Sequence, residues 1–416
     1  MTPRWYAALG ANDRRAFRTT FAGFCLNSLD VQLYAFVLPT ILGLWQMTHG
    51  AAGLLTTVAL VASAVGGWVG GFLADRLGRI RLLRATILGL ASATALCGLA
   101  ADFDQLFLAR ILQGFSFGAE WTIAAVFIAE TASPDSRGRM VGAVQSGWAI
   151  GWGLAGAISL VALAVLPPDL GWRATFFVGI VPAIVIFRLR LRLKESPVFQ
   201  ADRLRSPISA IFAKPIVGST IKGSLLASGM HGGYWAVATW WPTILRTERQ
   251  LSATASALHL GALIAGSLLG YFVGAWLADF AGRRMMLAGF AIGGAAMILI
   301  CTELSLSDTA LLVLAFPLGF FALGMFSVIG AVLTELFPTE MRGSGLGFCY
   351  NFGRGLAGAT PFFVGSTSTA LGLGHALGFY VTSAYGLVVV AAILLPETRG
   401  RRLDPGGSAP PIQPRD

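Results

Sequence analysis

The chain has 416 residues, of which 55% are hydrophobic and 12% charged, and its formal net charge is +10. Soluble proteins of this length carry about a quarter charged residues, so an ordinary soluble protein is excluded and a polytopic membrane protein is indicated. The four cysteines lie inside apolar runs without metal-ligand spacing, so we predict neither disulfides nor a metal site.

Apolar runs long enough to cross a bilayer, roughly 20 residues each, recur along almost the whole chain. Such runs are helical in lipid, because each backbone group must be satisfied within the segment. We therefore predict an all-α integral membrane protein with both termini on the same side. Its twelve spans are expected at about 18–44, 51–74, 81–101, 105–130, 139–165, 172–192, 219–245, 253–278, 285–304, 309–336, 344–370 and 376–396.

Lysine and arginine indicate the orientation, because cytoplasmic loops carry an excess of both. Of the 30 such residues, three lie in one set of loops (Arg173, Arg246 and Arg249) and two lie within spans (Arg110 and Arg354). The others lie in the termini and the opposite loops, which we place in the cytoplasm. We expect a plasma membrane protein, of the bacterial inner membrane, with both termini cytoplasmic and no nucleic-acid partner.

Three segments of the first half recur in the second half, in the same order and at offsets of 203 to 205. They are residues 39–42 and 242–245 (PTIL in both), 73–79 and 277–283, and 130–138 and 335–343. Duplication of a six-helix unit explains all three. Both copies then have the same orientation and are related by an axis along the membrane normal, with a site between them near the midplane.

The repeat and the composition predict four regions. Residues 1–192 form an N-terminal six-helix bundle, and residues 193–215 form a basic, proline-containing cytoplasmic linker. Residues 216–402 form a C-terminal six-helix bundle, and residues 403–416 form a cytoplasmic tail that is rich in Pro, Gly and charge and is expected to be disordered.

Residues 71–79 (GFLADRLGR), rich in glycine and charge, join the second and third spans, and residues 279–284 (DFAGRR) partly repeat them between the eighth and ninth. On these residues the chain resembles the major facilitator superfamily over nearly its whole length. One departure is Ile80 at the last basic position of the motif. The resemblance implies that the two bundles rock against each other and that this segment forms part of a breakable latch; a role in helix capping and topology alone stays open. The expected gating residues are Gly71, Asp75, Arg76, Gly78, Arg79, Glu130, Arg137, Asp279, Arg283, Glu335 and Arg342.

Further segments resemble the metabolite:proton and sialate:proton symporters of that superfamily, which mostly move organic acids. They include residues 118–121 (GAEW), 195–199 (ESPVF) and 240–243 (WWPT). Asn27 is a departure, since these relatives often have an acid there. The fifth span lacks the Gly-Pro pair of the drug/proton antiporters, which favours symport; the choice between the two subfamilies stays open.

Four formal charges lie well inside spans: Asp30, Arg110, Glu120 and Arg354. Each costs on the order of 3 kcal/mol at the bilayer centre, so each needs a partner or a wet cavity. Counting the helical rise of about 1.5 Å per residue puts all four at depths compatible with one central cavity.

The resemblance and the charges together suggest proton-coupling roles for Asp30, Arg110 and Glu120. Coupling requires a carboxyl that is ionised in one stage and neutral in another, and Asp30 beside Arg110 would form such a switchable pair. The alternatives are a permanent bridge between these two residues and, for Glu120, a structural hydrogen bond to neighbouring helices.

Arg354 is the expected site for a substrate anion. Its context, residues 351–355 (NFGRG), resembles the eleventh helix of organic-acid symporters, in which an arginine receives the substrate carboxylate. A guanidinium offers a planar fork that suits a carboxylate; the alternative is pairing with Asp30 or Glu120. We also expect substrate contacts from Asn351, Tyr34, His231, Tyr234 and Trp121, although His231 and the aromatic residues could equally be packing residues.

We therefore predict a proton-coupled symporter, not an enzyme, that imports a small organic anion by alternating access. The anion would be a mono- or dicarboxylate, an aromatic acid or a sugar acid. No nucleotide-binding loop is visible, so we expect no cofactor beyond the proton gradient, and as partners only protons, the anion and membrane lipid around a monomer. The alternatives are a transporter of neutral sugars or polyols, an exporter, and a ligand sensor that does not transport.

Overall fold

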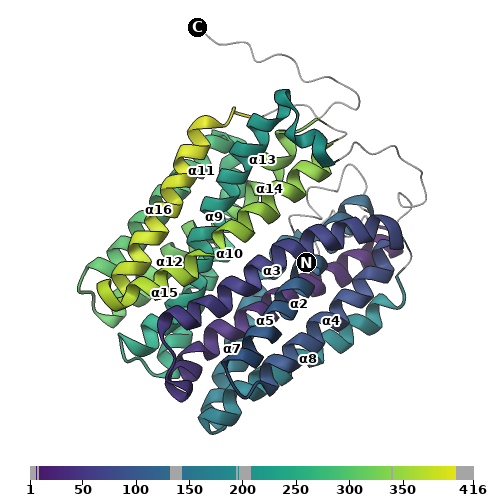
Figure 1. Ribbon diagram of the computed structural model, residues 1–416. Coiled ribbons are helices and arrows are strands. Elements are labelled where there is room, and N and C mark those ends of the chain that lie inside the picture. The colour runs from purple at the N-terminus through teal and green to yellow at the C-terminus, as the bar shows by residue number, and fades with distance from the viewer. Residues whose placement is uncertain are drawn as a thin grey trace.

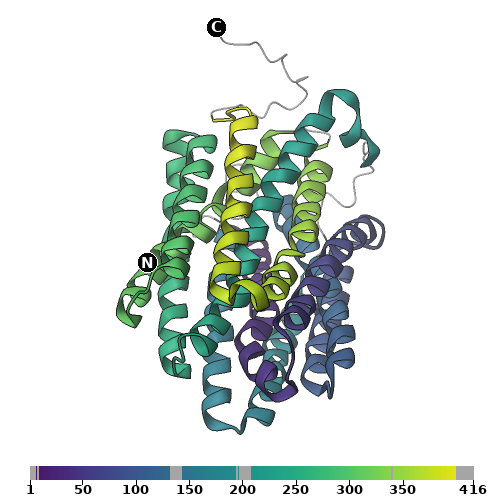
Figure 2. The same cartoon turned by 60° about the vertical axis from the view of Figure 1, so that its left-hand side comes forward.

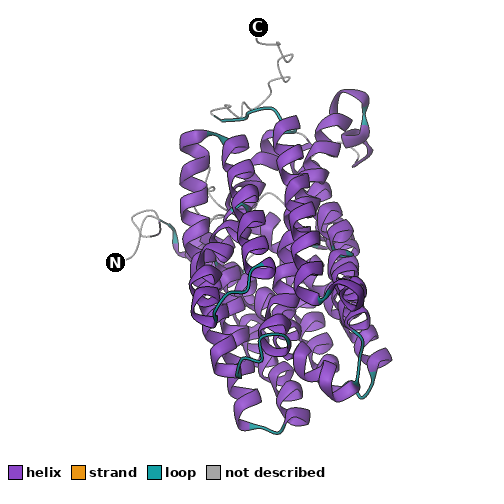
Figure 3. Ribbon diagram, turned by 90° about the vertical axis from the view of Figure 1, so that its left-hand side faces the viewer, coloured by secondary structure: helices purple, strands orange, loops and turns teal. Residues whose placement is uncertain are grey.

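The computed structural model describes residues 6, 9–131, 143–193, 195, 208–338 and 341–399, with side chains for all of them except 11, 75, 129–131, 208, 342 and 343. Throughout these ranges the regular elements are helices and no strand is present, as Figure 3 shows. The predicted all-α class is confirmed.

Six long helices form the first half of the molecule, and each corresponds to one predicted span. Figure 1 shows them as one group at the lower right, and Figure 2 shows the same group from another side. They are α2 (Ala11–Trp45), α3 (His49–Leu77), α4 (Arg79–Leu99), α5 (Phe103–Thr131), α7 (Gly147–Val165) and α8 (Pro168–Arg190).

The second half follows the short 3₁₀ helix η2 (Ile208–Phe212) and repeats this arrangement, with two of its six spans broken into two helices each. The unbroken spans are α9 (Lys214–Thr247), α10 (Ala253–Ala281), α11 (Arg283–Glu303) and α16 (Leu373–Leu394). The tenth span consists of α12 (Asp308–Gly324) and α13 (Phe326–Glu335), and the eleventh of α14 (Arg342–Ala357) and α15 (Thr360–Leu371).

Ten helical segments of the described chain are long and apolar enough to cross a membrane. The seventh and eleventh spans are outside this set for different reasons. The eleventh span is divided at Gly358 and Ala359 into two shorter helices. The seventh span is α9, which is buried without interruption over residues 226–245; because it is shielded from lipid, α9 can carry polar residues. With these two, the prediction of twelve spans in two six-helix bundles is confirmed.

Backbone irregularities repeat between the halves at an offset of 204 residues. Gln46 directly follows α2 and Gln250 lies three residues after the end of α9, and their φ are 50° and 54°. No other described residue except glycine has a positive φ. Gly78 and Gly282 join the second and third helix of each half at φ of 95° and 103° and ψ of 145° and 156°, a conformation accessible essentially to glycine alone. The duplicated unit thus includes its turns.

The two halves meet through α3 against α14 and α15, α2 against α9, and α7 against α10. Where α3 begins, glycines allow backbone-to-backbone contact with α15. A Cβ added to Gly53 would lie 2.8 Å from the Pro361 carbonyl carbon, and one added to Gly365 would lie 2.7 Å from that of His49. Small residues permit this approach between membrane helices. We call this end of the molecule, at the turn between α2 and α3, the far end, and the opposite end, at Gly78, the linker end.

Candidate functional site

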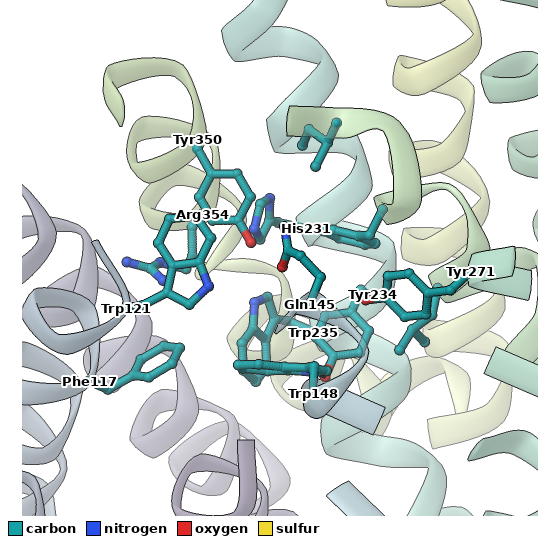
Figure 4. A pocket seen from close by; sticks show the side chains of 13 residues that line it. Phe117, Trp121, Gln145, Trp148, His231, Tyr234, Trp235, Tyr271, Tyr350 and Arg354 are labelled. Carbon is teal, nitrogen blue, oxygen red and sulfur yellow. Dashed lines mark hydrogen bonds between the residues drawn. The ribbon is translucent and has the colours of Figure 1, made fainter. Parts of the chain in front are cut away.

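A pocket with about 480 Å³ of space not filled by atoms lies between the two halves (Figure 4). Its walls come from α5, α7 and the residue Gln145 just before α7 in the first half, and from α9, α10, α12, α13 and α14 in the second. Within the described residues, no group of three His, Cys, Asp or Glu side chains is arranged to hold a metal ion. The pocket is lined by Phe117, Trp121, Gln145, Trp148, His231, Tyr234, Trp235, Tyr271, Leu323, Phe326, Ile329, Tyr350 and Arg354.

Arg354 brings a fixed positive charge to this pocket, and its side chain is 2% exposed. Its Nη2 donates hydrogen bonds to Asn351 Oδ1 at 2.6 Å and to the Ser63 carbonyl oxygen at 3.0 Å, whereas Nε has no partner among the described residues. No described carboxylate forms an ion pair with it, so the alternative pairing with Asp30 or Glu120 is absent from this structure. A buried cation with a spare donor is therefore part of the pocket wall.

Aromatic faces surround this guanidinium. Its Cζ lies 5.0 Å from the ring centroid of Phe117, 5.6 Å from that of Trp121 and 5.9 Å from that of Tyr350, which are cation–π distances. Trp121 and Tyr350 stack on each other across the two halves, with centroids 4.2 Å apart and planes 9° apart. The pocket thus combines one cation with flat apolar walls.

His231 and Tyr234 share one face of α9 and present polar atoms to the pocket. The His231 Nδ1 donates to the Ala227 carbonyl oxygen at 2.8 Å, because a carbonyl can only accept, and this leaves Nε2 available. The Tyr234 hydroxyl oxygen accepts from Gln32 Nε2 at 3.1 Å and from Trp148 Nε1 at 2.7 Å. Its own hydroxyl proton is therefore free for another acceptor, and the tyrosine joins the two halves.

Four residues of the pocket lining are not among the substrate contacts expected from the sequence: Gln145, Trp148, Trp235 and Tyr271. Trp235 is buried, lines the pocket and has an indole Nε1 without a partner among the described residues. A signal for Trp235 existed, since positions 231, 234 and 235 lie on one helical face. Gln145 and Tyr271 carry no such local signal.

Two expected substrate contacts lie outside the pocket lining. Asn351 is buried behind Arg354, donating from Nδ2 to the Gly347 carbonyl and accepting from Arg354. Tyr34 donates its hydroxyl to the Ala52 carbonyl at 2.9 Å and lies under the guanidinium of Arg110, 4.7 Å from ring centroid to Cζ. Asn351 therefore orients the arginine, and Tyr34 belongs to the interior of the first half.

Asp30 and Arg110 are both buried inside the first half but do not form an ion pair with each other. Gln113 lies between them: its Oε1 accepts from Arg110 Nη1 at 2.5 Å, and its Nε2 donates to the Asp30 backbone carbonyl at 3.3 Å. Thr94 lies beside the Asp30 carboxyl group without meeting the geometry of a hydrogen bond. Both carboxyl oxygens of Asp30 lack a partner among the described residues.

Glu120 forms a buried ion pair that sequence reasoning missed. Arg190, at the end of α8, donates from Nη2 to Glu120 Oε1 at 2.5 Å and from Nη1 to Oε2 at 2.8 Å, and both side chains are 1% exposed. Thr86 also donates to Oε2, at 2.6 Å. Of the four charges expected to line one central cavity, Arg354 alone lines this pocket, because depth along a helix does not determine which way a side chain faces.

A sequence model of the Major Facilitator Superfamily matches residues 20–265 and 223–414. The chain belongs to the major facilitator superfamily. It is therefore a multi-pass membrane transport protein and not an enzyme.

Curated relatives and solved structures agree with this membership. A probable 4-methylmuconolactone transporter of Cupriavidus pinatubonensis is 36% identical over 409 residues, covering 97% of this chain and 95% of that protein. A cis,cis-muconate transport protein of Acinetobacter baylyi is 28% identical, covering 92% and 94%. The sialic acid transporter NanX of Escherichia coli is 25% identical, covering 94% and 96%. The structure of a D-xylose-proton symporter, 20% identical, shares the fold with a TM-score of 0.76 and covers 94% of this chain and 100% of that one.

The superfamily motif at the linker end makes contacts within each half. Glu195 accepts from the backbone N–H groups of Arg79 and Ile80 at the start of α4, and Glu397 accepts from those of Arg283 and Arg284 at the start of α11. The two carboxylates stand in equivalent positions, one after the sixth helix of each half. They satisfy N–H groups that a helix start leaves unpaired.

Among the other expected gating residues, the structure describes the side chains of some and not of others. Arg283 donates to Asp279 at 2.7 Å and to Glu335 at 3.4 Å, both in its own half. Arg76 is exposed and lies 4.1 Å from the Phe72 ring centroid, and Gly71 packs near Thr122 of α5. The side chains of Asp75, Glu130, Arg137 and Arg342 lie outside the described residues. The latch role of all of these stays a prediction.

Proposed function

We propose that this transporter imports a small organic anion together with protons. The observation that carries the proposal is Arg354, a buried guanidinium that lines the central pocket without a described carboxylate partner. An unpaired charge is costly away from water, so a ligand anion that approaches the spare Nε relieves that cost while it binds. The names of the relatives, which are transporters of a muconolactone, muconate and sialic acid, support an organic acid.

The pocket favours a flat or unsaturated carbon skeleton. Its lining is rich in aromatic side chains, whose rings can pack against a planar ligand. The free hydroxyl proton of Tyr234 and the unpartnered Trp235 Nε1 add two neutral donors on α9. A ligand whose carboxylate binds Arg354 and whose second polar group lies toward α9 would satisfy all of these donors.

Asp30 is the proposed proton carrier. Its carboxyl group is buried and unpartnered among the described residues, and Arg110 lies one hydrogen-bonded side chain away through Gln113. If Arg110 leaves Gln113 during rocking, the guanidinium can stabilise the ionised carboxylate of Asp30. The neutral and the ionised Asp30 would then belong to different stages of the transport cycle.

The proposed cycle is alternating access in the plasma membrane, with the linker end and both termini in the cytoplasm and the transporter acting as a monomer. The close contact of Gly53 and Gly365 with the opposite half supports a far end that is closed in this structure. Rocking that opens the far end would expose the pocket to the outside.

Purified protein in liposomes tests the proposal. With an inward proton gradient, labelled cis,cis-muconate, a methylmuconolactone, nicotinate and sialic acid are offered beside neutral xylose. We expect accumulation of at least one acid, its loss when an ionophore dissipates the gradient, and no accumulation of xylose. Uptake of xylose but of no acid would contradict the proposal, and saturable binding without flux would indicate a sensor.

A further inference from the structure

One face of α2 carries a line of polar and small residues inside the first half. Gly23, Asn27, Asp30 and Tyr34 are spaced by four, three and four positions, so they lie one above another. At the linker end of this line, a Cβ added to Gly23 would lie 3.4 Å from Glu120 Oε1 and would touch the Arg190 guanidinium. At the other end, Tyr34 lies under Arg110.

Helices α2 and α5 run antiparallel along this line. Gln113 of α5 donates to the backbone carbonyl of Asp30 in α2. Seven residues later in α5 lies Glu120, and it neighbours Gly23, which lies seven residues before Asp30 in α2. Seven residues of helix span about 10 Å. Asn27 therefore lies between the Asp30 and Glu120 levels, on the face that connects them.

The middle of the line consists of unpartnered polar atoms. Both side-chain amide atoms of Asn27 and both carboxyl oxygens of Asp30 lack a hydrogen-bond partner among the described residues, and both side chains are 0% exposed. Buried polar groups in proteins are normally paired with protein or with ordered water. A glycine faces the carboxyl from α8: a Cβ at Gly179 would lie 3.0 Å from Asp30 Oδ1.

We propose that Asn27 and Asp30 bind a short chain of water molecules inside the first half, and that this chain carries the coupling proton between Asp30 and the linker end, past the Glu120–Arg190 pair. Asp30 gives its proton to the first water, each water passes one on, and the last releases one to the aqueous phase; the net reaction is ionisation of Asp30 and protonation of bulk water. The proposal rests on the proposed role of Asp30 as proton carrier.

The surroundings of Asp30 direct the proton along this line. The titratable groups that face it are Arg110 from α5 and Cys97 from α4, and α8 presents Gly179. Arg110 stays charged and cannot accept a proton. None of Asn27, Asp30 and Glu120 lines the central pocket, and Phe117 of α5, between the levels of Gln113 and Glu120, is part of the pocket wall. Proton and substrate thus have separate routes toward the linker end.

Two substitutions at Asn27 test the water chain. Asn27→Leu keeps the side-chain size but removes the polar atoms, whereas Asn27→Ser keeps a polar atom and leaves room for water. We expect proton-driven uptake to slow at least about a hundredfold in Asn27→Leu, the lower end of the range for a lost proton-transfer step, and to stay near wild type in Asn27→Ser. Substrate exchange at equal pH on both sides, which requires no net proton release, reports that both variants fold.

The outcomes are distinct. Wild-type uptake rates in Asn27→Leu would overturn the proposal, and equally slow uptake in both variants would overturn it too, because the amide itself and not water would then be required. If wild-type uptake proves independent of protons, the proposed function fails on its own account.

Hydroxyl-radical footprinting then tests the water independently of transport. Radicals form from water and oxidise the side chains next to it, and Cys97 lies beside Asp30 and Gln113. We expect Cys97 to be oxidised in wild type and protected in Asn27→Leu, relative to the equally buried Cys349 of the other half. Equal protection of Cys97 in both proteins would overturn the water chain.

Discussion

Asn351 holds Arg354 in place: the two residues lie one turn apart on α14, and the Arg354 Nη2 donates to the Asn351 Oδ1 at 2.6 Å. The amide nitrogen of Asn351 is in turn held by the Gly347 carbonyl at 2.9 Å. The guanidinium is therefore held in the pocket wall with a fixed orientation and with Nε unused. A pre-oriented fork binds a carboxylate with less loss of side-chain freedom than a mobile one.

The first prediction concerns this arginine. Arg354→Gln removes the charge but keeps a polar side chain, and we expect the substrate concentration for half-maximal uptake to rise at least about tenfold, since a charge-assisted hydrogen bond contributes roughly 1.5–3 kcal/mol. Initial uptake rates over a range of substrate concentrations measure it.

Two comparison variants accompany Arg354→Gln. Arg354→Lys should recover part of the affinity, because it restores the charge without the planar fork. Arg188→Gln, an exposed arginine of α8, should behave as wild type. An unchanged half-saturation concentration in Arg354→Gln would remove this arginine from the binding site.

Most of the fold could be predicted from the sequence because hydrophobicity and the repeat are encoded locally. The twelve spans follow from apolar runs, and the duplication follows from matches such as PTIL at residues 39–42 and 242–245. The break at Gly358 and Ala359 was not predicted, since one apolar run covers both α14 and α15. Composition sets the length of a hydrophobic run but not a local change of helix direction.

The site was only partly predictable because a sequence does not show which way a buried side chain faces. Arg354 lines the pocket between the halves, while its role there stays a prediction, and its Asn351 contact has the spacing of helical neighbours. The Glu120–Arg190 pair joins α5 to α8 across 70 positions, and no local pattern signals such a contact. Gln113 separates Asp30 from Arg110 for the same reason.

The second prediction concerns proton coupling. Asp30→Asn mimics the neutral carboxyl at all pH values, so we expect the variant to lose accumulation driven by the proton gradient and to keep exchange of labelled for unlabelled substrate. Both are measured in the same liposomes. Accumulation against a concentration gradient by Asp30→Asn would show that Asp30 has a structural role.

The third prediction concerns the Glu120–Arg190 pair. Removing one partner leaves the other charged and buried, and such losses cost about 3–5 kcal/mol. We therefore expect Arg190→Met to lower the thermal unfolding midpoint in detergent strongly, and Arg188→Gln, two positions away and exposed, to leave it unchanged.

A double variant separates the pair from the packing around it. Glu120→Met with Arg190→Met removes both charges, and replacing a buried pair by apolar groups is often close to neutral. We expect it to be clearly more stable than Arg190→Met alone. A midpoint for the double variant below that of the single variant would contradict mutual neutralisation as the main role of the pair.

The fourth prediction concerns Glu397, outside the spans, which caps the start of α11. Partial burial raises the pKa of this carboxyl, but the backbone N–H groups of Arg283, Arg399, Arg284 and Thr398 outweigh burial and hold the pKa below its ordinary value of 4.5. Because the folded pKa is lower than the unfolded one, the cap stabilises the fold fully above pH 4.5 and loses this effect as the pH falls through the folded pKa. Glu397→Gln should therefore have a lower unfolding midpoint than wild type at neutral pH. The difference between the two midpoints should become smaller in acid. Asp104→Asn, at an exposed position of α5, is the matched control. A gap between wild type and Glu397→Gln that stays constant from neutral pH to well below pH 4.5 would show that the ionised carboxyl does not stabilise α11.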